Sequence, residues 1–93
     1  MSDRTARSLA KLDELIGRLA ALPAGSQKDD VLETAAALRR AVAAFHMEAI
    51  RFRMYSVDRF LKQFGDQSCL STFEEVRHEL ETAGFHTRSH AAP

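Results

Sequence analysis

Glycine and proline are missing from the whole middle of this chain. The four glycines and two prolines all lie outside residues 26–64. Because these residue types mark most helix ends and sharp kinks, their absence predicts one uninterrupted helix from residue 27 to residue 64. That helix would be about 57 Å long, whereas a compact chain of this size has a radius of gyration of only about 13 Å. The sequence therefore predicts a helix that protrudes from its own globule and covers its apolar surface with another molecule.

An excess of charge of either sign is also missing. The 93 residues include 13 Lys and Arg side chains and 13 Asp and Glu side chains, so the formal net charge is zero. A chain without a basic excess lacks the long-range attraction that draws proteins to polyanions. We therefore expect neither nucleic acid nor a membrane surface as the partner.

Cysteine and long hydrophobic runs are equally scarce. Cys69 is the only cysteine, so no disulfide can form within the chain, and a reducing compartment is the simplest expectation. The longest apolar run, from Ala41 to Phe45, is far shorter than the roughly 20 residues that span a bilayer. The first residues lack the apolar core of a secretory signal. These features predict a soluble cytoplasmic protein.

The remaining sequence is typical of an all-α fold. Leucine and isoleucine recur at helical spacing between residues 9 and 19, which predicts a first helix over residues 3–22. Ser71 and Glu74 form a capping box that predicts a third helix over residues 72–83, and Gly84 followed by Phe85 is typical of its end. We expect one domain over residues 1–85, with three helices, and a mobile tail over residues 86–93.

The second half of the predicted long helix carries more apolar surface than one neighbouring helix can cover. This surface predicts a dimeric helical bundle in which two chains pair through the long helix. Its expected interface residues are Phe45, Ile50, Phe52, Met54, Val57, Phe60 and Leu61. The favoured function is a non-enzymatic regulatory or adaptor protein that binds another protein through an apolar helix face, with no catalytic residue and no cofactor.

A second interpretation makes the protein an anion or small-molecule sensor. Arg39, His46 and Arg53 are spaced by seven residues, so on a continuous helix they fall inside the apolar arc. Charged groups there are costly unless they are paired, and a bound anion could pair them. The alternative is that the long arginine stems lie on apolar surface while their charged ends reach water.

A third interpretation is a metal-binding helical bundle. Glu75 and His78 have the Glu-x-x-His spacing of carboxylate-bridged di-iron bundles, but those sites need two such motifs and two further glutamates. Cys69, His78, His86 and His90 lack the close ligand pairs of structural zinc sites. We therefore expect no metal, and a solvent-exposed role for Glu75 and His78.

Overall fold

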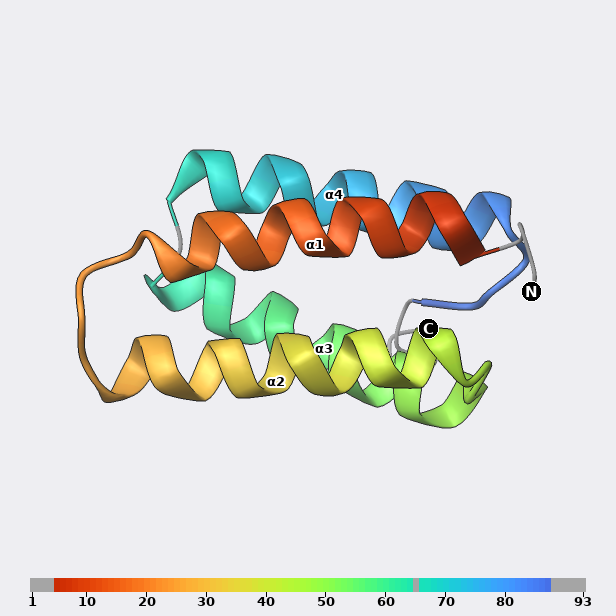
Figure 1. Ribbon diagram of the computed structural model, residues 1–93, viewed down its shortest axis with the longest axis horizontal. Helices are drawn as coiled ribbons and strands as arrows, with labels where there is room; N and C mark the ends of the chain where they lie inside the picture. The colour runs from red at the N-terminus through yellow and green to blue at the C-terminus, as the bar shows by residue number, and fades with distance from the viewer. Residues whose placement is uncertain (1–4, 65, 88–93) are drawn as a thin grey trace.

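Four helices make up the part of the chain that the structure describes. The structure is a computed structural model, and it describes residues 5–64 and 66–87. The helices are α1 (Ala6–Ala20), α2 (Ser26–Ala43), α3 (Met47–Phe64) and α4 (Gln67–Thr82). They run antiparallel in turn, with α4 beside α1 and α3 beside α2 (Figure 1). The all-α prediction is confirmed, and no strand occurs among these residues.

The prediction of one long helix between residues 27 and 64 is wrong. The chain reverses direction at Ala44–His46, and α2 and α3 pack side by side (Figure 1). The Phe45 amide donates to the Val42 carbonyl at 3.1 Å, and the His46 amide donates to the Ala41 carbonyl at 2.9 Å. These two bonds define a Schellman motif, in which the residue that ends the helix takes a left-handed conformation. Phe45 takes that position with φ of 60°.

The physical reason for the break is burial within the same chain. A left-handed conformation costs a residue with a side chain roughly 1–2 kcal/mol. The reversal lets Ile50, Met54, Val57 and Leu61 on α3 become at least 99% buried against the other helices. Each such side chain gains about 1.5–3 kcal/mol when it leaves water completely. The gain outweighs the strain several-fold, so a sharp reversal forms without glycine or proline.

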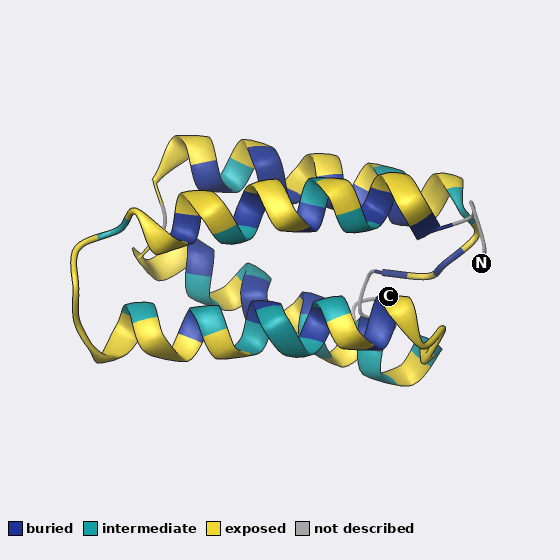
Figure 2. Ribbon diagram, in the orientation of Figure 1, coloured by how far each residue is buried: buried dark blue, intermediate teal, exposed yellow. Residues whose placement is uncertain are grey.

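The folded chain therefore covers its own core. The principal extents are 34 × 33 × 19 Å, and the radius of gyration is 12.3 Å. A helix of 18 residues, the length of both α2 and α3, spans about 27 Å and fits within these extents. Buried positions line the inner side of every helix (Figure 2). The core side chains are Leu12, Leu15, Leu19, Val31, Ala35, Leu38, Ala41, Val42, Ile50, Met54, Val57, Leu61, Cys69, Phe73, Val76, Leu80 and Phe85.

The last helix begins earlier than the sequence predicted. α4 starts at Gln67 instead of residue 72, because Asp66 takes the N-cap position and its side chain accepts a hydrogen bond from the Cys69 amide at 2.8 Å. The capping box at Ser71 and Glu74 thus lies inside the helix. The hydrogen bond to the Cys69 backbone lowers the pKa of Asp66, which keeps the cap charged at the positive end of the helix.

Of residues 86–93, for which a mobile tail was expected, the structure describes only residues 86 and 87. Gly84 ends α4 with φ of 97°, and the chain then turns back between α4 and α3 (Figure 1). Thr87 is 3% exposed and is hydrogen-bonded to α4. Residues 88–93 lie outside the described part of the chain. Among the described helices, none combines the length and apolar character needed to cross a bilayer.

Candidate functional site

The outer side of α3 exposes large aromatic side chains. Phe52 is 60% exposed and Tyr55 is 47% exposed. Their spacing, with Arg59 four residues further along, places all three on the side of α3 opposite to the buried residues. We call Phe52, Arg53, Tyr55 and Arg59 the α3 aromatic face.

Arginines lie over both rings of this face. The Arg53 Cζ is 5.2 Å from the centre of the Phe52 ring, and the Arg59 Cζ is 5.8 Å from the centre of the Tyr55 ring. Both distances fall within the range for cation–π attraction, which is worth about 0.5–1 kcal/mol at an exposed site. The contacts hold long flexible side chains against the rings, so the face loses less side-chain freedom when it binds a partner.

Charge is divided unevenly between the two helices that follow the reversal. Four basic and two acidic residues occur on α3, and the acidic Asp58 pairs inward with Arg77 of α4 at 3.8 Å. α4 carries the opposite excess, with Glu74, Glu75, Glu79 and Glu81 against Arg77. The aromatic face therefore belongs to the basic side of a molecule that is neutral as a whole.

A smaller apolar hollow lies where α3 ends near the α1–α2 turn. Phe60 and Phe64 pack with ring centres 5.0 Å apart, and they line a cleft of about 210 Å³ with Leu22 and Pro23. Ligand pockets usually measure about 300–1,000 Å³. This cleft is the size of one side chain, and it does not indicate a cofactor or metabolite site.

The expected interface residues divide into three groups by exposure. Ile50, Met54, Val57 and Leu61 are buried by their own chain, so their assignment to an intermolecular interface is corrected. Phe60 is half-buried and packs against the core. Two expected residues remain well exposed, namely Phe45, which is 40% exposed, and Phe52. The reversal at Phe45 explains the division, because it turns the apolar side of α3 toward α2 and the core.

The proposed strip of Arg39, His46 and Arg53 is not formed. The reversal puts Arg39 on α2, His46 in the turn and Arg53 on α3. Arg39 instead donates hydrogen bonds to both carboxylate oxygens of Asp13 on α1, at 2.6 and 3.1 Å. These hydrogen bonds lower the pKa of Asp13 and raise that of Arg39. The ion pair joins α2 to α1. The anion that neutralises the Arg39 guanidinium is therefore the Asp13 carboxylate of the same chain.

The contacts of Glu75 and His78 also disfavour the metal interpretation. Glu75 accepts a hydrogen bond from the Lys11 ammonium at 2.9 Å, and this contact is the main cause of the raised pKa of Lys11. Glu75 and His78 line a surface hollow of about 370 Å³ beside that ammonium, which disfavours a cation there. Residues 5–64 and 66–87 contain no group of three metal-ligating side chains. His90 lies outside the described residues.

The environment of the Cys69 thiol does not favour a nucleophilic role. Cys69 is buried, and burial is the main cause of its raised pKa, with the Asp66 side chain adding to the shift. A thiol held protonated in the core is unreactive.

Comparison with models of protein families, with curated proteins and with solved structures gave no match. The candidate site therefore rests on the geometry of the chain. The sequence interpretation missed Tyr55 and Arg59. The spacing of residues 52, 55 and 59 places them on one side of a helix. That side can be recognised as the exposed one only once residues 50, 54, 57 and 61 are known to face inward.

Proposed function

We propose that this protein is a non-enzymatic regulatory or adaptor module that binds another protein through the α3 aromatic face. The observation that carries the proposal is the pairing of Phe52 and Tyr55, both exposed, with two arginines that lie over their rings. Aromatic residues and arginine are enriched among the residues that dominate binding energy at interfaces. An isolated exposed aromatic residue needs no explanation, but two on one face of one helix are a candidate anchor.

The charge of the face indicates the kind of partner. Arg53 and Arg59 belong to the basic side of the bundle, so the complementary surface is acidic. A partner segment with Asp or Glu beside an apolar anchor would place carboxylates on the guanidinium groups while its apolar side chains cover the rings. We therefore propose an acidic protein surface as the occupant.

Self-association is the alternative that the experiment must separate. The original reason for a dimer, an oversized helix, no longer applies, but two copies could still pair their aromatic faces about a two-fold axis. That arrangement brings like charges together at Arg53 and Arg59, which disfavours it. Sedimentation of the pure protein should give the 10.4 kDa mass of one chain.

Site-specific photo-crosslinking tests the proposal. A benzophenone amino acid at Phe52, in cells that express the protein, should form a crosslink to a protein segment rich in Asp and Glu, identified by mass spectrometry. Arg59→Glu should abolish the crosslink, because it reverses the charge that faces the partner. The matched control replaces Ala10, an exposed residue on α1, with the same crosslinker and should give no product.

Three results would overturn the proposal. A crosslink that survives Arg59→Glu, or that appears equally from residue 10, would show that contact is not specific to the face. A crosslink between two copies of the chain would assign the face to a homodimer.

A further inference from the structure

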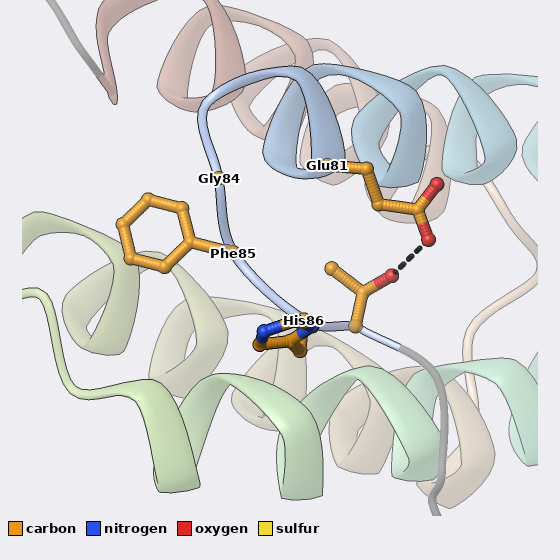
Figure 3. Close-up of a pocket in the computed structure, with 5 residues that line it drawn as sticks. Glu81, Gly84, Phe85 and His86 are labelled. Atoms are coloured by element: carbon orange, nitrogen blue, oxygen red, sulfur yellow. Dashed lines mark hydrogen bonds between the residues drawn. The ribbon is translucent and has the colours of Figure 1, made fainter.

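Residues 84–87 cover a sparse contact between two consecutive helices, α3 and α4. Among helices that follow one another in the chain, α3 and α4 make the sparsest contact, although only two residues separate them in the sequence. Residues 84–87, which follow the end of α4, run back between these two helices (Figures 1 and 3). We call these four residues the strap. We call the surface that the strap contacts the groove, and its residues are Phe45, Met47, Arg77 and Glu81.

An aromatic side chain anchors the strap. Phe85 is 4% exposed and points from the strap toward the α2–α3 end of the bundle (Figure 3). Its ring meets the Phe45 ring edge-on, with centres 5.8 Å apart. The next backbone amide, of His86, donates to the Met47 sulfur at 3.4 Å. The strap therefore contacts both the turn before α3 and the first residue of α3.

A buried arginine binds the far end of the strap. Arg77 is 6% exposed, and its Nη1 donates to the backbone carbonyl and to the hydroxyl of Thr87, each at 3.2 Å. The same hydroxyl donates to Glu81 at 3.0 Å, drawn as a dashed line in Figure 3. Arg77 also reaches Asp58 of α3 at 3.8 Å. A buried guanidinium that loses acceptors is strongly destabilised, so this part of the groove requires a carbonyl and a hydroxyl oxygen.

We propose that the groove between α3 and α4 is a peptide-binding site, and that the strap is its internal ligand. The occupant in trans is an extended segment of another protein that carries an aromatic residue two positions before threonine, the pattern of Phe85 and Thr87. Phe45 contacts the ring of the aromatic residue, Met47 accepts a hydrogen bond from the backbone amide that follows it, and Arg77 with Glu81 binds the hydroxyl. The site is separate from the α3 aromatic face, so it goes beyond the proposed function.

The strap regulates this site by competition. A tethered segment acts at a millimolar effective concentration, so a segment in trans binds only the fraction of molecules whose strap is released. The apparent affinity of the partner is lowered by that fraction. Weakening the internal ligand should therefore strengthen binding of the external one, which is opposite to the effect of damaging the groove.

Peptide complementation tests the proposal with the full-length chain. The probe is a fluorescein-labelled peptide with the sequence of residues 82–93, and its matched control carries alanine in place of Phe85. The chain with Phe85→Ala should bind the probe at least about tenfold more tightly than the unaltered chain, measured by anisotropy. The control peptide should bind neither chain, and Arg77→Met combined with Phe85→Ala should remove the gain.

Thermal melting gives a readout that holds even where the variant is unstable. The probe should raise the melting temperature of the Phe85→Ala chain, or restore its helical circular dichroism, and the control peptide should do neither. Equal affinity of the two chains for the probe would overturn the proposal. So would equal rescue by both peptides, an unfolded variant that the probe does not restore, or a dimer of the unaltered chain formed by exchanged straps.

Discussion

The ends of α2 and α4 share one hydrogen-bond pattern but place different residues at its strained position. At the end of α4, Gly84 has φ of 97°, and Phe85 donates to the Leu80 carbonyl at 2.9 Å. At the end of α2, Phe45 has φ of 60°, and His46 donates to the Ala41 carbonyl at 2.9 Å. Glycine takes this conformation freely, whereas phenylalanine does not.

The two helix ends differ in the interactions that stabilise them. Gly84 ends α4 by local preference, and Phe85 adds an apolar contact that commonly accompanies the motif. Phe45 ends α2 against local preference, because the chain beyond it buries a whole helix face. Local preference ends α4, whereas tertiary burial ends α2. The two helix ends are nevertheless neighbours, because the rings of Phe45 and Phe85 are in contact.

The largest expected loss of stability concerns the buried residues of α3, which follow the reversal at Phe45. Ile50→Asp should unfold the chain, because it places an unpaired charge at a fully buried position, and such changes cost more than about 4 kcal/mol. Circular dichroism should show loss of helix, and sedimentation should show the mass of a single chain. Phe52→Asp, two residues away and 60% exposed, is the control and should remain folded. A folded Ile50→Asp monomer would mean that the α2–α3 reversal does not depend on this burial.

The next effect separates the two rings that meet between the helix ends. Phe85→Ala should lower the free energy of unfolding by about 3–5 kcal/mol, since Phe85 is 4% exposed. Phe45→Ala should lower it by only about 1 kcal/mol, since Phe45 is 40% exposed and loses mainly the edge-on ring contact. Urea denaturation measures both values. Equal losses would contradict the difference in burial.

A smaller effect tests the strained backbone itself. Gly84→Ala should lower the free energy of unfolding by about 1–2 kcal/mol, because alanine is strained at positive φ. Phe45→Gly should be more stable than Phe45→Ala by about 1 kcal/mol for the same reason. Chemical denaturation of the three variants provides the comparison. If Phe45→Ala were the more stable of its pair, strain would not distinguish the two helix ends.

The smallest effect concerns the ion pair that holds α2 against α1. Asp13→Asn should lower the free energy of unfolding by less than about 1 kcal/mol at neutral pH, because the pair with Arg39 is exposed to solvent. Arg39 lowers the pKa of Asp13 in the folded chain, so the contribution is complete above the unfolded pKa and is lost as the pH falls through the folded pKa. The difference between the two proteins should therefore begin to shrink below about pH 4 and vanish only once the pH is below the lowered pKa of folded Asp13. A difference that persists at pH 2 would assign the effect to something other than the carboxylate charge.

The sequence predicted features that depend on nearby residues. Regular apolar spacing gave the all-α class, and Gly84 with Phe85 gave the end of α4. The sequence also showed that the second half of residues 27–64 carries more apolar surface than one neighbouring helix can cover. That surplus did not distinguish a reversal from a wide interface, because a continuous helix in a dimer would bury the same side chains.

The candidate binding sites depend on contacts between distant residues. Phe52 was expected at an interface, but Tyr55 and Arg59 join it only because α3 turns its other side inward. Arg77 gave no signal as a buried group, since an arginine on a glutamate-rich helix normally faces water. Its partners, Asp58 and Thr87, lie 19 residues before it and 10 residues after it in the chain.

By itself, the sequence determined that this chain forms amphipathic helices and that α4 stops at a glycine. Only the tertiary structure decided that residues 27–64 form two helices and that the strap fills the groove between α3 and α4. The physical reason is the balance at Phe45. A strain of roughly 1–2 kcal/mol is local and opposes the reversal, while the larger free energy of burying the inner face of α3 exists only when the helices meet.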